Sequence, residues 1–120
     1  NQLITIVYEL MQFLVIGKDG TDEKKMERRM AARQAHLDLG EKMRQSGNRW
    51  YGAALLDDAN TMIGSMAVMD FPSEKELQEW LHREPYVTGG VWKSVEVIKC
   101  DVKTPWQFNK KRPKGSKWYY

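Results

Sequence analysis

The sequence predicts an α+β domain of the ferredoxin-like kind, in which a βαββαβ order of elements builds a four-stranded antiparallel sheet with both helices on one face. Three observations support this prediction. Residues 22–46 and 73–84 carry apolar residues at helical spacing, and each follows a strand-like stretch. A hairpin-like segment, residues 50–71, lies between them. The 120 residues are enough for one such domain with a core of its own.

The first strand is predicted over residues 11–16, where MQFLVI is almost wholly apolar. We expect residues 17–20, which include two glycines, to break this strand. Residues 1–10 are also strand-like but are interpreted as an N-terminal extension or leader, because the methionine at position 11 looks like a natural start. We therefore expect a domain over residues 11–102, followed by a basic, aromatic C-terminal tail over residues 103–120.

Residues 22–46 predict the first helix, since they contain no proline and many strong helix formers. Thr21 or Asp22 is expected to cap its start, and Gly47 to end it. Its apolar residues at helical spacing are Met26, Met30, Leu37, Leu39 and Met43. His36 falls inside this apolar arc, and the neighbouring rows carry Arg29, Arg33 and Gly40. The helix is therefore expected to turn a histidine toward the sheet, with arginines nearby.

The second and third strands are predicted as a β-hairpin. Residues 50–56 and 61–71 are rich in residues that suit a pleated surface. Between them, residues 57–60 (DDAN) are typical of a turn.

The second helix is predicted to begin after Ser73, which is spaced from Glu76 as in a capping box. Pro85 is expected to end it. The pair Gly89-Gly90 permits a tight corner, after which residues 91–102 predict the last strand. This corner places a carboxylate, that of Glu84, where a helix ends and the final strand begins.

The net charge of +3 depends on the tail, which holds six basic residues and no acidic one. Without the tail the charge is −3, so a basic stripe for nucleic acid is not indicated on the domain itself. The tail, with aromatic residues among its lysines, is the one segment typical of a nucleic-acid or acidic-partner binder. A tail that folds back on a partner subunit is the stronger interpretation, and nucleic-acid binding is not expected.

The remaining composition indicates a cytoplasmic protein. Cys100 is the only cysteine, so no disulfide framework is expected. The longest mostly apolar run, residues 3–16, is too short and too interrupted for a membrane span and lacks the pattern of a signal peptide. His36, His82 and Cys100 have no metal-ligand spacing, and no phosphate-binding glycine loop is present. We therefore expect no metal and no cofactor.

Three short motifs carry a resemblance. They are Arg33-Gln34-Ala35-His36-Leu37, Gly64-Ser65, and Glu84-Pro85-Tyr86-Val87 with Gly90-Val91-Trp92. At this separation they make residues 11–100 similar to the YCII-related family, small proteins of the dimeric α+β barrel type. The resemblance implies a homodimer that packs through the sheet face opposite the helices. It also implies an active site of a helix histidine and an acid near the corner, and at least one relative removes chloride from a chlorinated hydroxyquinone.

Transferred by position, the site residues are His36 and Glu84. At the position of Glu84 the family more often has aspartate. A carboxylate bonded to one imidazole nitrogen fixes the tautomer and leaves the other nitrogen to take or give a proton. Arg33 is expected to supply a positive charge for a small anionic or aromatic metabolite, Ser65 a hydroxyl, and Tyr86 a wall of the pocket. The blander alternative is a histidine that bonds within the fold and a carboxylate that ends a helix.

The sequence thus indicates a cofactor-independent lyase, of dehydrochlorinase type, or an isomerase. The alternative from a different class is a non-catalytic small-molecule-binding or accessory module that holds the same ligand unchanged. Interaction with nucleic acid or protein through the tail is a third, weaker alternative.

Overall fold

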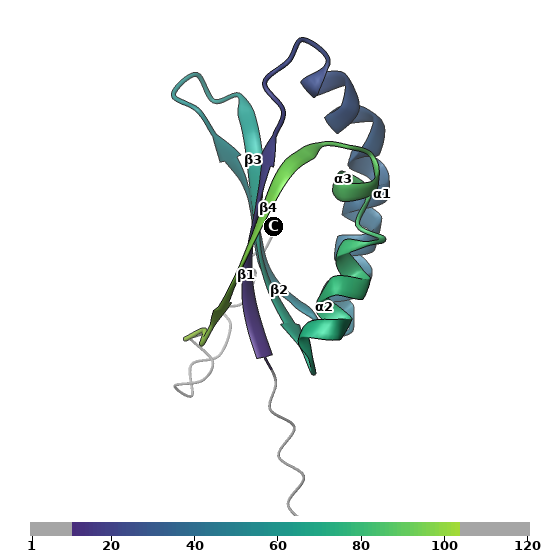
Figure 1. Ribbon diagram of the computed structural model, residues 1–120, viewed down its shortest axis with the longest axis vertical. Coiled ribbons are helices and arrows are strands. Elements are labelled where there is room, and N and C mark those ends of the chain that lie inside the picture. Colours follow the sequence, from purple (N-terminus) through teal and green to yellow (C-terminus); the bar gives the residue numbers. More distant parts are fainter. Residues whose placement is uncertain (1–10, 104–120) are drawn as a thin grey trace, which may run out of the picture.

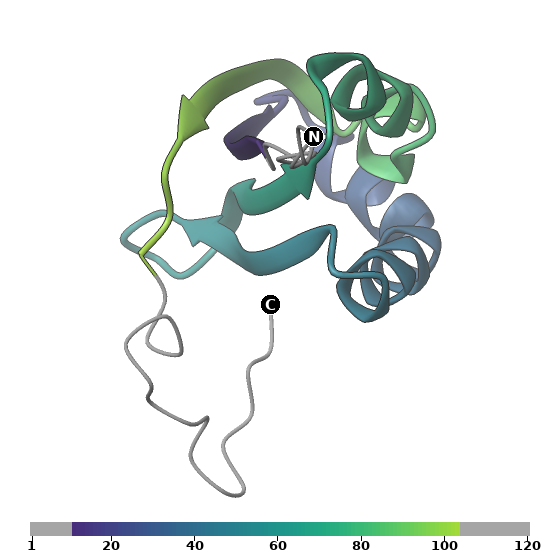
Figure 2. The same cartoon turned by 90° about the horizontal axis from the view of Figure 1, so that it is seen from below.

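The computed structural model describes residues 11–103 and confirms the ferredoxin-like α+β fold (Figure 1). Its strands are β1 (Met11–Asp19), β2 (Arg49–Leu56), β3 (Met62–Phe71) and β4 (Trp92–Cys100). Its helices are α1 (Lys25–Gln45), α2 (Glu74–Leu81) and α3 (Pro85–Thr88). The strands form one antiparallel sheet in the order β2-β3-β1-β4. All three helices lie on one face of this sheet (Figures 1 and 2).

The predictions for the two chain ends concern residues outside the described part. The proposed extension over residues 1–10 and the tail beyond residue 103 both lie there. Within residues 11–103, no helix is long and apolar enough to cross a membrane.

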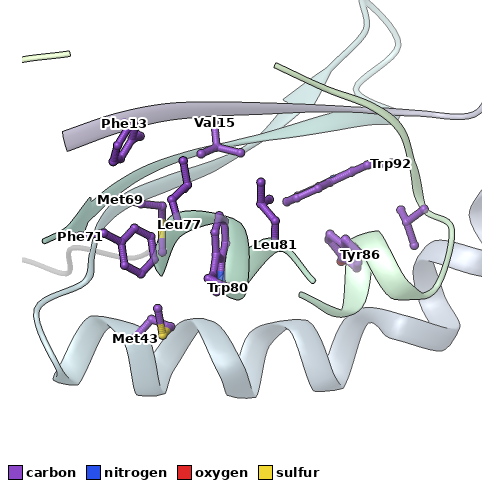
Figure 3. Packing of buried hydrophobic residues seen from close by; sticks show 11 residues of the cluster. Phe13, Val15, Met43, Met69, Phe71, Leu77, Trp80, Leu81, Tyr86 and Trp92 are labelled. Carbon is purple, nitrogen blue, oxygen red and sulfur yellow. The ribbon is translucent and has the colours of Figure 1, made fainter. Parts of the chain in front are cut away.

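The core fills the space between the sheet and the helices (Figure 3). Phe13 and Val15 of β1 point toward the helices, because alternate residues of a strand face the same side. Leu77 and Trp80 of α2 meet them from the other side, and α1 contributes Met43. This closed cluster fixes α1 and the corner after α2 against the sheet, which positions the residues described below.

The start and the buried face of α1 differ from the prediction. The helix begins at Lys25 without a side-chain cap, and Asp22 instead accepts hydrogen bonds from Arg28, whose guanidinium lowers the pKa of that carboxyl. The apolar arc was also wrong in part, since Met30 and Leu37 are exposed, whereas Arg29 is buried. The reason is tertiary, because Arg29 has a buried ionic partner on β1.

Gly17 does not break the first strand, contrary to the prediction. β1 continues to Asp19 and pairs with β3 on one side and β4 on the other, with a shift of register only at Lys18/Asp19. The absence of a side chain at Gly17 instead allows the Trp92 ring to pack against the strand. A Cβ at Gly17 would lie 2.2 Å from the indole ring of Trp92, which occupies the space above the strand.

Gly17→Ala is therefore expected to lower the free energy of unfolding by about 1–3 kcal/mol, because an added methyl in a packed site forces neighbours to move. Urea unfolding of the parent and the variant measures this cost. The matched test is the same change in a Trp92→Val background, where the indole is gone and the cost is expected to be much smaller. Equal costs in the two backgrounds contradict this account.

The centre of the sheet face opposite the helices is apolar, and no helix of the described residues covers this face. Strand pairing places Leu14 beside Val68 on one side and Ile98 on the other, and Ile16 beside Met66. Asp70 lies on the same face, beside Gln12, and its side chain is almost fully buried. One of its oxygens, Oδ1, has no hydrogen-bond partner within residues 11–103.

Asp70 is expected to make stability depend on pH. Burial raises the pKa of its carboxyl, partly opposed by Gln12, so the folded chain binds the proton more tightly than the unfolded chain. The free energy of unfolding therefore falls as pH rises through the raised pKa. We expect Asp70→Asn to be more stabilising, relative to the parent, near about pH 7 than near about pH 4. Urea unfolding at both pH values checks this, and a constant difference contradicts it.

Candidate active site

A cavity of about 160 Å³ lies between α1 and the sheet. The five predicted site residues all line it, although they come from separate parts of the chain. They are Arg33, His36, Ser65, Glu84 and Tyr86. The structure thus brings α1, β3 and the corner after α2 together around one space.

The corner that carries Glu84 is built differently from the prediction. α2 ends at Leu81, and Pro85, expected to end that helix, is instead the first residue of the short helix α3. Glu84 has extended backbone angles, as a residue before proline prefers. Its carboxylate accepts a hydrogen bond of 3.2 Å from the backbone N–H of Tyr86 and so caps α3. Of the two glycines, only Gly90 has a positive φ, 68°.

The Glu84 carboxylate also contacts His36. Its Oε1 atom accepts a hydrogen bond from Nδ1 of the imidazole, and the Glu84 side chain is only 2% exposed. A carboxylate accepts hydrogen bonds but does not donate them, so Nδ1 carries a proton in this arrangement. The other nitrogen, Nε2, has no hydrogen-bond partner within the described residues, and the ring is 20% exposed. His36 therefore lines the cavity and has one ring nitrogen without a hydrogen-bond partner among the described residues.

Aromatic contacts fix the plane of the imidazole. The Tyr86 ring stacks on it with centroids 3.8 Å apart and an angle of 9° between the planes. Trp92 meets both rings by its edge, at 6.2 Å from His36 and 5.8 Å from Tyr86. Figure 3 shows Tyr86 and Trp92 together at one end of the core. Burial raises the pKa of Tyr86, so its hydroxyl keeps its proton at neutral pH.

Arg29 and Asp19 form a second group, of which the sequence placed Arg29 near His36 but did not indicate Asp19. Both side chains are 3% exposed, and Nη1 of Arg29 donates to Oδ1 and Oδ2 of Asp19 at 2.9 and 2.7 Å. The guanidinium also lies 4.8 Å from the centre of the Tyr86 ring. The available signal was the spacing of seven residues between Arg29 and His36, which places both on one helix face.

Ser65 links this ion pair to Trp92. Its hydroxyl oxygen accepts hydrogen bonds from Nη2 of Arg29 at 3.1 Å and from the indole Nε1 of Trp92 at 3.2 Å. Nη2 of Arg29 also donates to the carbonyl of Gly64 at 3.3 Å. By contrast, Arg33 is exposed, although it also lines the cavity. No group of three or more His, Cys, Asp or Glu side chains suited to a metal ion occurs within residues 11–103.

Fold and site together define a ferredoxin-like α+β domain with one cavity beside a histidine–carboxylate hydrogen bond. The family model of the YCII-related domain matches residues 11–104, so the chain belongs to the YCII-related family. A similar solved structure is that of 5-chloro-2-hydroxyhydroquinone dehydrochlorinase (TftG) from Burkholderia phenoliruptrix AC1100, in complex with 2,5-dihydroxybenzoquinone. It is 23% identical, with a TM-score of 0.65 over 76% of this chain and 94% of that chain. No curated protein matches the sequence.

Proposed function

We propose that the chain is an acid–base enzyme of the cytoplasm that catalyses elimination, or alternatively isomerisation, of a small anionic or aromatic metabolite in this cavity. His36 acts as the acid–base and Glu84 as the group that orients it. The observation that supports this best is the hydrogen bond at Nδ1, since it leaves Nε2 as the nitrogen that can exchange a proton, on a residue that lines the cavity. The reaction needs no metal or cofactor, because removal of a proton and departure of an anion involve no change of oxidation state.

The proposed elimination runs as one proton transfer followed by loss of an anion. Nε2 of His36 takes a proton from a saturated substrate carbon next to the carbon that bears the leaving group, and the pair of electrons from that C–H bond forms a double bond. A chlorinated hydroquinone reacts from the keto tautomer in which the carbon bearing chlorine is saturated. His36 then takes the proton of a ring hydroxyl, the O–H electrons form a C=O bond, and the ring C=C electrons move toward the carbon that loses chloride. The leaving group, for example chloride, departs with the electrons of its own bond. The Glu84 carboxylate stabilises the imidazolium, which then returns its proton to water. Arg33 attracts the anionic substrate, and Tyr86 holds the imidazole plane.

The size of the cavity favours a substrate with a single ring. An apolar cavity of roughly 150 Å³ is large enough for benzene, and the volume here is about 160 Å³. The similar dehydrochlorinase is named for a substrate with one chlorinated ring, and its solved complex contains a dihydroxybenzoquinone. Compounds of this kind are therefore the first to test.

The test measures chloride release from 5-chloro-2-hydroxyhydroquinone and binding of 2,5-dihydroxybenzoquinone by calorimetry. We expect the parent to release chloride from the chlorinated compound. His36→Gln is expected to bind the quinone but to release no chloride. His82→Gln is the matched control, because His82 is exposed and bonds only a backbone carbonyl of its own helix. Turnover unaffected by His36→Gln overturns the proposed role of His36.

A non-catalytic binding module is the second candidate, and one observation favours it. The Glu84 carboxylate caps α3 as well as binding His36, so the pair also has a purely structural use. For this candidate we expect quinone recovered unreacted and bound equally well by the parent and by His36→Gln.

We further propose that a second copy of the chain covers the apolar sheet face. Ile98 is 42% exposed and lies beside Leu14 on that face, and a contiguous exposed apolar patch is typical of a contact surface between proteins. Ile98→Lys is expected to convert a dimer into a monomer in sedimentation experiments. Val95→Lys is the matched control, because Val95 on the same strand has a similar exposure of 38% but pairs with Gly17 and lies on the other face. A monomeric parent contradicts the proposal.

A further inference from the structure

The hydrogen bonds of Ser65 leave its hydroxyl hydrogen without a partner. A serine hydroxyl has one hydrogen to donate and two lone pairs to accept with. Arg29 and Trp92 both donate to the Ser65 oxygen, and neither an arginine N–H nor an indole N–H can accept in return. Both lone pairs are therefore occupied. Within the described residues the hydrogen has no acceptor, although Ser65 is only 7% exposed and lines the cavity.

Arg29 also has an N–H group that makes no hydrogen bond within the described residues. A guanidinium offers five N–H groups. Two hydrogen bonds go from Nη1 to Asp19, and two go from Nη2, to Ser65 and to the Gly64 carbonyl. The remaining Nε–H is buried and has no hydrogen-bond partner within residues 11–103. A buried donor without an acceptor is costly, so native proteins rarely keep one without use.

These contacts also strengthen Ser65 as a donor. A hydroxyl that accepts hydrogen bonds, one of them from a cation, gives up its own hydrogen more readily, because linked hydrogen bonds polarise one another. Ser65 and Arg29 are both buried, and a hydrogen bond is electrostatically stronger in such surroundings than at the surface. Asp19 balances the charge of Arg29, so the site offers directed N–H and O–H donors and little net charge.

We propose that the Ser65 hydroxyl, held by Arg29 and Trp92, is the oxyanion-binding donor of the cavity, and that the substrate is a carbonyl compound, such as the keto form of a quinol, whose oxygen gains negative charge as His36 removes a carbon-bound proton. This inference rests on the proposed function and names its substrate class. Trp92 connects the two groups, since its indole bonds Ser65 and its edge contacts the ring of His36. Arg33 is less suited to this role, because it is exposed to water.

The proposed step balances without a further reagent. The C–H bond next to the carbonyl breaks, and its proton bonds to Nε2 of His36. The electrons of that bond form a C=C bond, while the C=O π electrons move to the oxygen as an additional lone pair. The enolate oxygen then accepts the hydrogen bond from Ser65 more strongly than the carbonyl did, which is how such donors favour a transition state.

The test compares two ring compounds of similar size, fully ionised 4-nitrophenol and 4-nitrotoluene, by equilibrium dialysis. The phenolate oxygen imitates the enolate, whereas the methyl group cannot accept a hydrogen bond. We expect the parent to prefer the phenolate and Ser65→Ala to weaken phenolate binding by about tenfold or more, with 4-nitrotoluene unaffected. Ser94→Ala, at an exposed position of β4, is the control and should leave both affinities unchanged.

A second variant guards against a folding defect in Ser65→Ala, which leaves two buried donors without their acceptor. Trp92→Phe frees one lone pair of Ser65, so the hydroxyl can turn away from the ligand, and we expect a fall in the phenolate preference of about threefold.

A phenolate preference that is unchanged in both variants, or absent from the parent, overturns the inference. If the preference for the phenolate is lost in His36→Gln but kept in Ser65→Ala, the inference about Ser65 is also overturned. The proposed function then still stands. If Ser65 controls the preference while chloride release is independent of His36, the proposed function fails and the donor site stands.

Discussion

Replacing His36 by glutamine is expected to lower kcat for the compound that the cavity converts by about 10²–10⁴-fold, the usual contribution of a positioned acid–base. The glutamine amide can still donate to the buried Glu84 carboxylate, so the fold and ligand affinity should change little. It cannot take a proton from carbon, so the loss should fall on kcat and not on the dissociation constant. Single-turnover kinetics and calorimetry measure the two quantities separately. A kcat within threefold of the parent contradicts this prediction.

The role of Glu84 is tested by combining variants. If Glu84 acts only through His36, Glu84→Gln lowers kcat, but adding it to His36→Gln produces no further loss, because the two residues work as one unit. Glu84→Asp restores the acid that the family more often has at this corner, one methylene shorter. It is expected to retain more activity than Glu84→Gln, since the charge remains. Independent, additive losses in the double variant mean that Glu84 does not act through His36.

Much of the fold could be predicted because its signals are local. Residues 50–56 and 61–71 are strand-like on either side of a turn sequence, and both occur as the β2–β3 hairpin. Ser73 accepts a hydrogen bond from the Glu76 N–H, as the capping pattern indicates. The orientation of His36 toward the sheet also follows from helical periodicity alone.

The errors arose where a distant residue decides the outcome. Gly17 resembles a strand breaker until the Trp92 indole, seventy-five residues later, is seen to occupy the space above it. Arg28 and Arg29 are adjacent in the sequence, yet only Arg29 pairs with a buried carboxylate, that of Asp19. Helical spacing places Arg29 on the face of His36, but it does not give the buried partner, because Asp19 lies on another element.

The residues of the site could be predicted from the sequence better than the way in which the chain positions them. The resemblance to a family indicated His36 and Glu84, and both line one cavity. Helical spacing did not indicate that Glu84 caps a separate short helix, since α3 has only four residues. The network through Asp19 was not predicted at all. Arg29 connects Asp19 at the end of β1 with Ser65 on β3, and no short sequence motif indicates such a connection.

Replacing Arg29 by methionine is expected to have the largest effect on stability, a loss of about 3–5 kcal/mol in the free energy of unfolding. Methionine fills similar space but leaves the Asp19 carboxylate, 3% exposed, buried without its partner. Since domains of this size are stable by only about 5–15 kcal/mol, the variant should be close to unfolding. Arg28→Met is the matched control, because the neighbouring arginine pairs with Asp22 in an exposed position, where such pairs contribute little. Equal losses in the two variants contradict the expectation.

Adding Asp19→Leu to Arg29→Met distinguishes a role in the fold from a role in the site. The double variant has no unpaired buried charge, and an apolar pair in place of a buried ion pair is often as stable as the original. We therefore expect urea unfolding to show that most of the lost stability returns. The Ser65 hydroxyl would still lack its cationic donor, so the preference for 4-nitrophenolate over 4-nitrotoluene is expected to stay low. Recovered stability together with a recovered preference would mean that the ion pair does not serve the donor site. Recovered stability without the preference means that the chain keeps a buried ion pair, which the fold does not require, for the chemistry of the cavity.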